Sequence, residues 1–236
     1  LDGKLAITTD GHVVQPLEFP GGDIGRLAVC GTVNDLAVTG ARPLYITASF
    51  ILEEGLPVST LERVVDSMGR AVQEADVSLV AGDTKVVGRG GCDGIFISTT
   101  GVGVVRPEHD GIAEARDVQP GDAVLISGPV ATHGAAIICA RNGLEGDPPI
   151  RSDTGPLSGL TAMLIEKRVD LRFMRDATRG GMATVLCELA EKRDLGIEVE
   201  EERVPMGPGV RGVCEMYGFD PLYLANEGVM ILVVPP

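Results

Sequence analysis

Four short acidic segments contain the residues of this 236-residue chain that are best suited to chemistry. Each follows or interrupts an apolar stretch and has small or amide neighbours; the segments are Thr8–Gly11, Asn34–Asp35, Gly82–Lys85 and Asp176–Gly181. Small neighbours let a ligand approach the backbone, and carboxylate oxygens suit a Mg²⁺ site that holds a polyphosphate. The alternative is that these acids form turns or cap helices, which is the commoner role of a single aspartate.

A nucleotide would bind among these acids only together with a divalent cation. Two like charges about 4 Å apart repel by roughly 4 kcal/mol at an effective dielectric constant near 20, so two carboxylates facing phosphate would cost about 8 kcal/mol. Micromolar affinity corresponds to about 8.2 kcal/mol and would be cancelled by that repulsion. The pattern therefore predicts nucleotide binding that depends on the metal.

Two further residues are candidates for proton transfer. Lys85 is one of four lysines and stands between an Asp-Thr pair and two valines, where partial desolvation would lower its pKa. Its alternative role is that of a surface lysine after a turn. Glu227 precedes the last apolar run of the chain and would act as an acid or base if it is buried. Its alternative is a surface β-turn.

The remaining polar motifs suggest no other chemistry. A P-loop, a complete dinucleotide fingerprint, zinc-ligand spacings and a G-x-S-x-G elbow are absent from the sequence. His133 is expected to cap or pack at a helix start, and Arg151–Gly155 is expected to be a polar loop without a role in catalysis. The five cysteines are widely spaced without a C-x-x-C pair, which indicates reduced cytoplasmic thiols, with Cys92 the most exposed.

Charge and composition exclude several classes of partner. The chain has 20 basic and 34 acidic residues, a net charge of −14, and only 3% aromatic residues without tryptophan. Phosphate backbones are held by basic patches and single-stranded bases by aromatic platforms, so we expect neither a nucleic acid nor an anionic membrane as partner. Glycine, proline and histidine interrupt the longest uncharged stretch, 123–140, and a soluble, cytoplasmic protein is expected.

The elements that must position these residues form two α/β layered domains, which we expect over residues 1–108 and 109–236. The first has a helix from about 22 to 39 and a second after Ser59, which with Glu62 forms a capping box. Its strands, rich in valine, isoleucine and leucine, need cover on both faces, and a second copy would supply it. Its predicted strands are 4–9, 43–52, 77–81 and 95–105; the second domain has predicted strands 123–127 and 229–234 and helices 132–141, 157–168, 182–193 and 208–217.

A resemblance to a known family rests on six segments, which are Phe19–Ala28, Asn34–Pro43, Phe50–Pro57, Gly82–Val87, Asp176–Gly181 and Leu224–Gly228. Together they resemble the HypE family of hydrogenase maturation proteins, the carbamoyl dehydratases, along the whole chain. The Thr-Thr-Asp, Asn-Asp and Asp-x-Thr-Arg-Gly-Gly elements are shared with the wider superfamily of aminoimidazole ribonucleotide synthetase, selenophosphate synthetase and thiamine-monophosphate kinase. The Ile-Leu-Glu-Glu-Gly-Leu-Pro, Gly-Asp-Thr-Lys-Val-Val and Ala-Asn-Glu-Gly runs resemble HypE specifically.

The resemblance implies a fold, a reaction and partners. It implies two domains of the aminoimidazole ribonucleotide synthetase type, with the second truncated at its C-terminus, and a homodimer built by the first domains, with ATP bound between domains near the dimer interface. It implies ATP-dependent dehydration of an S-carboxamide on a C-terminal cysteine to a thiocyanate, the source of cyanide for the iron of [NiFe]-hydrogenase. HypF would donate the carbamoyl group and the HypC–HypD complex would accept the cyanide.

The resemblance also assigns roles to single residues of this sequence. Asp10, Asp35 and Asp176 would bind the Mg²⁺ of Mg²⁺-ATP. Lys85 and Glu227 would transfer protons at the carboxamide, and both would reach it only if the two domains close around the site. The residues implied to contact ATP are Asn34, Asp83, Thr84, Thr178, Gly180, Gly181 and Asn226.

Departures from the family pattern leave other functions open. The family's N-terminal glycine-rich segment and its Pro-Arg-Ile-Cys end have no counterpart here, so none of the five cysteines is expected to be the substrate. A related enzyme, a selenide or thiamine-phosphate kinase, would use the same metal carboxylates with a different acceptor pocket. A non-catalytic dimerisation or docking module is the alternative from another class, and the intact acids Asp10, Asp35 and Asp176 count against it.

Overall fold

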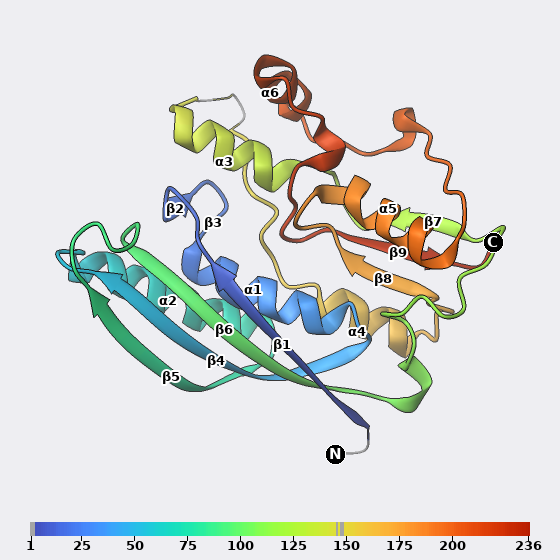
Figure 1. Ribbon diagram of the computed structural model, residues 1–236, viewed down its shortest axis with the longest axis horizontal. Helices are drawn as coiled ribbons and strands as arrows, with labels where there is room; N and C mark the ends of the chain where they lie inside the picture. The colour runs from blue at the N-terminus through green and yellow to red at the C-terminus, as the bar shows by residue number, and fades with distance from the viewer. Residues whose placement is uncertain (1–2, 145, 147–148) are drawn as a thin grey trace.

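The first half of the chain is a four-stranded sheet with two helices on one face. The computed structural model describes residues 3–144, 146 and 149–236 (Figure 1). The sheet order is β1-β6-β4-β5, and all neighbours are antiparallel except β4 and β5. The elements are β1 (Lys4–His12), the small hairpin β2 (Glu18–Phe19) and β3 (Gly22–Asp23), α1 (Ile24–Ala37), β4 (Ala41–Glu53), α2 (Val58–Glu74), β5 (Ser78–Val87) and β6 (Ile95–Val105).

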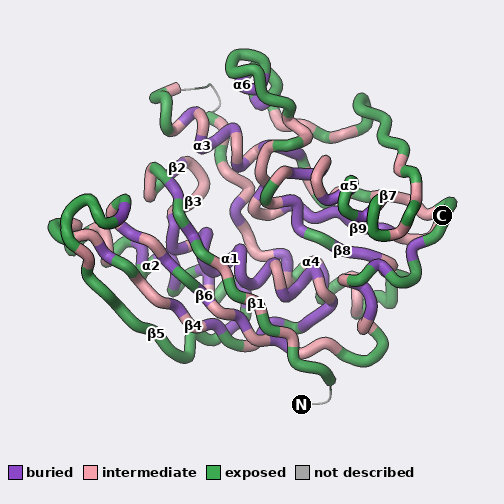
Figure 2. Tube along the Cα trace, in the orientation of Figure 1, coloured by how far each residue is buried: buried purple, intermediate pink, exposed green. Residues whose placement is uncertain are grey.

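Helix α1 is the centre of the molecule. Twelve of its 14 residues are buried, because it lies between the first sheet, α2 and the second half of the chain (Figures 1 and 2). The Asp23 carboxylate starts it by accepting the backbone N–H of Gly25 at 2.7 Å and of Arg26 at 3.1 Å. A helix that is buried on all sides holds its polar residues at fixed places inside the fold. Asn34 and Asp35, near its end, therefore face the second half.

The second half is a three-stranded antiparallel sheet of order β7-β9-β8. Phe173, Ile231 and Val233 on one face share a core with α3, α5 and α6. Met174 and Met230 on the other face pack towards α4. The elements are η1 (Pro107–His109), β7 (Ala123–Ile126), α3 (Thr132–Asn142), α4 (Ser158–Glu166), β8 (Phe173–Asp176), α5 (Gly181–Arg193), η2 (Glu201–Arg203), α6 (Val210–Tyr217), η3 (Pro221–Tyr223) and β9 (Met230–Val234).

One face of the first sheet has no covering layer. Ile7, Val102 and Tyr45 are register partners across β1, β6 and β4 and so share a face, on which Ile7 and Tyr45 are exposed. Strand β5 is exposed along nearly its whole length (Figure 2). Within the described residues, no strand pairs with the outer edges of β1 or β5. This open face therefore presents apolar side chains to solvent, and the backbone groups on the outer edges of β1 and β5 have no strand partner among the described residues.

The structure confirms the two-domain α/β fold and corrects several local predictions. Asp10 lies inside β1 rather than in a turn after it, and β5 continues straight through Gly82–Lys85, because both segments have a neighbouring strand to pair with. The predicted capping box is wrong: α2 follows Pro57 without a side-chain cap. Strand β8 was not predicted, since four residues are too few to show a period.

The structure also shows how far the cysteine thiols and His133 are buried. Cys92 is buried with its thiol against the Ile51 carbonyl, whereas Cys187 on the outer side of α5 is exposed, so the prediction that Cys92 is the most exposed thiol is wrong. His133 packs edge-on against Phe19, as a buried residue would. Among the helices described, none combines the length and apolar character needed to cross a bilayer.

Candidate active site

Carboxylates from both halves of the chain meet at the C-terminal end of α1. Asp35 comes from α1 and Asp176 from the last position of β8, and both line a pocket of about 270 Å³ together with Thr8 of β1. The Thr8 hydroxyl donates a hydrogen bond to Asp35 Oδ2 at 2.8 Å, which orients this carboxylate. The pocket therefore joins three elements that are far apart in the sequence.

Asp10 lies on the same face of β1 as Thr8, two residues further along. Its Oδ2 is 3.4 Å from Nε2 of the buried His12, and that nitrogen is also 3.1 Å from the Thr99 hydroxyl. Gly31 of α1 makes room for both side chains, because a Cβ there would stand 3.1 Å from the His12 ring and 3.4 Å from Asp10 Oδ2. Close packing of α1 on β1 thus brings Asp10 towards the carboxylate pocket.

The carboxylates disfavour each other's ionisation. Burial, with the nearby charge of Asp176, raises the pKa of Asp35 to about 6. Burial raises the pKa of Asp176, and Asp10 adds to the effect. The pKa of Glu227 is raised well above its usual value by burial and then by the charges of Asp153, Asp176, Asp10 and Asp35. A cation or a proton is therefore needed to hold this group together at neutral pH.

The donor set fits Mg²⁺ in chemistry without forming a closed cage. In the described part of the chain, no three histidine, cysteine, aspartate or glutamate side chains stand close enough to ligate one ion. Mg²⁺ commonly takes one or two protein carboxylates and completes its shell with phosphate oxygens and water. Asp35 and Asp176, with Asp10 beside them, supply oxygen donors of that kind, and their repulsion would be relieved by the ion.

Hydrogen bonds from the side chain of Asn34 on α1 hold the loop that carries Glu227. The side-chain amide of Asn34 donates to the backbone carbonyls of Gly155 at 3.0 Å and Glu227 at 3.2 Å, and its oxygen accepts the N–H of Leu157 at 2.7 Å. Asn34 is 0% exposed, and both its amide nitrogen and its oxygen are hydrogen-bonded inside the protein. In the structure Asn34 fixes the loop that carries Glu227, and its implied contact with ATP stays a prediction.

Asn226 has a similar internal role. It is 0% exposed, its Oδ1 accepts the N–H of Ala131 at 2.8 Å, and its amide donates to the Ala177 carbonyl at 3.0 Å. These bonds tie the Glu227 loop to the start of α3 and to the end of β8. The structure thus gives Asn226 an internal role, and its implied contact with ATP stays a prediction.

The segment after Asp176 shapes the start of α5. A hydrogen bond from the Thr178 side chain lowers the pKa of Asp176 against the effect of burial. Gly180 and Gly181 have φ angles of 75° and 60°, which other residues rarely adopt. A Cβ on Gly181 would also stand 2.5 Å from the Leu222 carbonyl. Thr178 is thus next to the acidic pocket, while the two glycines are explained by the turn and its packing.

Asp83, Thr84 and Lys85 lie apart from this pocket in a single chain. Lys85 Nζ donates to Asp83 Oδ2 at 2.7 Å, and the side chains of the two are 69% and 63% exposed. Asp10 shares the helix-covered face with the buried Thr99, its partner in the register. Asp83 and Lys85 stand on the open face, three strands away, roughly 14 Å at about 4.8 Å per strand. The expected desolvation of Lys85 is therefore wrong for a single chain, while its role in proton transfer stays a prediction.

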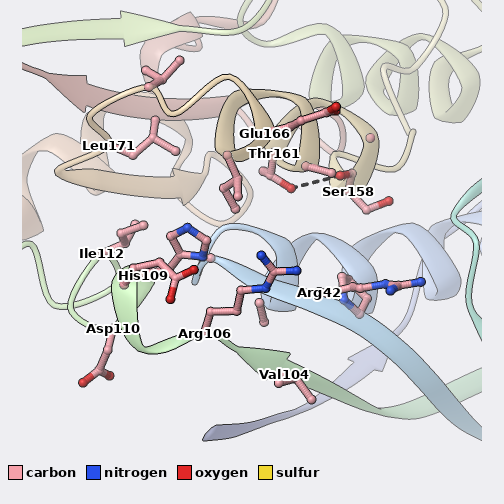
Figure 3. A pocket seen from close by; sticks show the side chains of 18 of the residues that line it. Arg42, Val104, Arg106, His109, Asp110, Ile112, Ser158, Thr161, Glu166 and Leu171 are labelled. Carbon is pink, nitrogen blue, oxygen red and sulfur yellow. Dashed lines mark hydrogen bonds between the residues drawn. The ribbon is translucent and has the colours of Figure 1, made fainter. Parts of the chain in front are cut away.

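A larger groove lies elsewhere in the described structure. It has a volume of about 1210 Å³ and runs between α4 and the starts of β4 and the segment after β6. Figure 3 shows Arg42 and Arg106 on one wall and Ser158 and Thr161 of α4 on the other. It contains none of the predicted site residues. We therefore assign the chemistry to the smaller acidic pocket.

Two residues of the site were not found from the sequence. Asp153 accepts hydrogen bonds from the Glu227 loop, and Arg175, beside Asp176, lowers the pKa of Asp35. Asp153 and Glu227 are 74 residues apart, and neither local composition nor spacing connects them. Only the tertiary structure shows that the loops of these two residues are in contact.

Comparisons with known proteins agree with the fold. The family model "AIR synthase related protein, N-terminal domain" matches residues 1–105, and "AIR synthase related protein, C-terminal domain" matches residues 119–236. A solved thiamine monophosphate kinase from Aquifex aeolicus is similar over 99% of this chain and 80% of its own, with a TM-score of 0.73 at 20% identity, which shows the fold alone.

Closer relatives share much more of the sequence. Carbamoyl dehydratase HypE of Rhodobacter capsulatus is 52% identical over 98% of this chain and 68% of its own length, and that of Escherichia coli K12 is 46% identical over the same shares. A crystal structure of hydrogenase maturation protein HypE in complex with ATP has a TM-score of 0.95 and 48% identity over 100% of this chain and 70% of that one. The chain spans about two thirds of these relatives. It belongs to the HypE family of carbamoyl dehydratases, proteins of hydrogenase maturation.

Proposed function

We propose that this chain contains the ATP-dependent site that dehydrates a cysteine S-carboxamide to a thiocyanate, the form in which cyanide is passed on to the iron of [NiFe]-hydrogenase. The observation that carries the proposal is the meeting of Asp35 and Asp176 in one pocket between the two halves of the chain, near enough to Glu227 for their charges to raise its pKa. Membership of the HypE family and the ATP complex of a relative support it. We also propose a cytoplasmic location, which the five free thiols favour.

The reaction requires activation of a poor leaving group. The carboxamide oxygen attacks the γ-phosphorus of ATP, ADP leaves, and the nitrogen gives up one proton, which yields an imino phosphate. The second N–H proton is then removed while the carbon–oxygen bond breaks, so that phosphate leaves and the carbon–nitrogen triple bond forms. The oxygen of the carboxamide ends in phosphate and both nitrogen protons are released, so the peptide loses the elements of one water while ATP becomes ADP and phosphate.

Glu227 is the base that suits the nitrogen protons. Burial and the surrounding carboxylates raise its pKa, which makes its carboxylate a stronger base than that of an exposed glutamate, and its loop is fixed by Asn34 on one side. Bound Mg²⁺ would take one or two of the carboxylates of Asp10, Asp35 and Asp176 together with phosphate and water oxygens, and would supply charge neutralisation for the phosphates. The same charge would lower the proton affinity of the neighbouring acids, so Glu227 becomes available as a base when the nucleotide complex is in place.

Lys85 is proposed to act from a second copy of the chain. The open face carries exposed apolar side chains, and the outer edge of β1, the strand of Asp10, is free in the described structure. A homodimer formed on this face would cover the apolar residues and bring β5 of the partner to that edge. Lys85 of the partner subunit would then lie beside the carboxylates of the first chain, whereas the Lys85 of the first chain lies away from them.

Other partners follow from the family. A crystal structure of a HypE–HypF complex contains a relative 48% identical to this chain, with a TM-score of 0.91 over 98% of this chain and 75% of that one. We propose that HypF supplies the carbamoyl group here and that a HypC–HypD complex takes the cyanide. Both steps are outside the chemistry of the acidic pocket itself.

The test supplies the substrate separately, as a short peptide with an S-carbamoylated cysteine. With Mg²⁺-ATP, mass spectrometry should show loss of one water from the peptide, together with ADP. Glu227→Gln should keep ATP affinity within a few-fold by calorimetry and lower product formation by about 10²–10⁴. Glu215→Gln, an exposed glutamate on α6, is the matched control and should behave as the unmodified protein. Full activity of Glu227→Gln would refute its role.

Mixing two inactive variants tests the partner's contribution. Equal amounts of the Lys85→Ala and Glu227→Gln chains are unfolded and refolded together, so that about half of the dimers contain one chain of each kind. If Lys85 acts across the interface, each mixed dimer has one intact site. We therefore expect about one quarter of the full activity. If both groups act within one chain, every site has a defect and mixing restores nothing, which would contradict the shared site.

A further inference from the structure

Asp153 contacts the loop of Glu227 through the backbone. Its Oδ2 accepts the N–H groups of both Glu227 and Gly228, each at 3.1 Å. A carboxylate oxygen that accepts two successive N–H groups restrains the peptide between them, and such charge-assisted bonds are roughly twice as strong as neutral ones. The direction in which the Glu227 side chain leaves the backbone is therefore set in part by Asp153.

The loops that carry Asp153 and Glu227 pack in direct contact. A Cβ at Gly228 would stand 2.0 Å from the Asp153 carbonyl, so only glycine allows the loops to approach this closely. The N–H of Gly155 donates to the Glu227 carbonyl at 3.3 Å, which ties the same peptide from its other side. Glu227 thus has both its N–H and its carbonyl bonded to the segment 153–155.

That segment is anchored to the first half of the chain and to α3. The N–H of Ser152 donates to the Pro20 carbonyl at 2.7 Å, and Arg26 Nε donates to the Thr154 carbonyl at 2.9 Å. The Ser152 hydroxyl is 2.8 Å from Nδ1 of the buried His133. Since α1 also holds Asn34 and Asp35, this anchoring ties the position of Glu227 to the helix that supplies the metal-binding acids.

The Asp153 carboxyl is surrounded by backbone N–H groups. Burial raises its pKa, and the N–H groups of Glu227, Gly228, Asp153 itself and His133 act in the opposite direction. The side chain of Asp153 is therefore directed at the backbone of the Glu227 loop.

We propose that Asp153 is the positioning residue for Glu227, which fixes the Glu227–Gly228 peptide so that the Glu227 carboxylate meets the nitrogen of the carboxamide. Asp153 itself does not touch the substrate in this arrangement. The inference rests on the function proposed above, because it concerns the placement of the base in that reaction.

The activity test uses the S-carbamoylated peptide and compares two substitutions at one site. Asp153→Ala removes both bonds and should lower kcat by about 10–100-fold, the usual effect of losing a group that orients a reacting one, with the KM for ATP unchanged. Asp153→Asn keeps an oxygen that accepts both N–H groups and should restore kcat to within a few-fold. Arg151→Ala, at an exposed position at the start of the same loop, is the control and should leave kcat unchanged.

A second measurement does not depend on activity. Hydrogen exchange of the Glu227 and Gly228 amides should accelerate in Asp153→Ala and stay slow in Asp153→Asn and in the control Arg151→Ala. Unchanged exchange in Asp153→Ala, or equal loss of kcat in the alanine and asparagine variants, would overturn the positioning role. If the unmodified protein does not dehydrate the peptide, the proposed function fails, and the exchange experiment still decides whether Asp153 fixes this peptide.

Discussion

Replacing Asp35 by asparagine should make the metal-free protein more stable while it abolishes Mg²⁺-ATP binding. The pKa of Asp35 rises from 3.8 to about 6 in the folded chain, through burial and the charge of Asp176. A carboxyl whose folded pKa is above its unfolded pKa favours the folded state at low pH, and that contribution is lost as the pH rises from about 4 to about 6. Above this range the ionised Asp35 opposes folding.

The size of the effect follows from the shift. A shift of about two units corresponds to about 3 kcal/mol, and partial solvent access at this position reduces it to about 1–2 kcal/mol. Asparagine keeps an oxygen that accepts the Thr8 hydroxyl and removes the charge. The variant should therefore match the unmodified protein near pH 4 and exceed its unfolding free energy by about 1–2 kcal/mol near pH 7.5.

Urea unfolding at several pH values in the presence of EDTA measures this difference. Asp66→Asn, at an exposed position of α2, is the matched control and should show no pH-dependent gain. Mg²⁺-ATP should then stabilise the unmodified protein and leave Asp35→Asn unchanged, since a ligand stabilises only the state that binds it. Lower stability of Asp35→Asn at pH 7.5, or equal stabilisation of both proteins by Mg²⁺-ATP, would refute the reasoning.

Three further substitutions test other parts of the structure. Ile7→Glu on the open sheet face should convert dimers to monomers in light scattering, whereas Val58→Glu on α2, where the residue is equally exposed (70% against 68%), should not; a dimer in both would remove that face from the interface. Asn34→Ala removes the side-chain hydrogen bonds to the Gly155 and Glu227 carbonyls and to the Leu157 N–H, and should lower the unfolding free energy by about 2–4 kcal/mol in urea titrations, against less than about 0.5 kcal/mol for the exposed Asn142→Ala. Gly228→Ala places a Cβ 2.0 Å from a loop carbonyl and should abolish peptide dehydration with ATP affinity retained in calorimetry; normal turnover would show that the loop can move apart without consequence.

Much of the fold was predictable from local pattern. Strand β6 and the helices α3 and α5 have bounds within a residue or so of those expected, because a sustained apolar period and clear glycine or charged ends mark them. The two-layer organisation of each half follows from the same alternation of strands and helices. The short β8 and the straight passage of β5 through Gly82–Lys85 were missed, since both depend on a neighbouring strand that supplies hydrogen bonds.

The sequence by itself determined which residue types are present for chemistry: acids beside small residues, one lysine among valines, and a glutamate before the last strand. The tertiary structure decided which of them meet. The alternation of residues along a strand shows that successive side chains point to opposite faces, but it does not show which face a helix covers. Only the structure shows that Asp10 faces α1 and that Lys85 faces the open side. Burial of Asn34 and Asn226, and the contact of Asp153 with Glu227, arise from loops brought together across the whole chain, where no local signal exists.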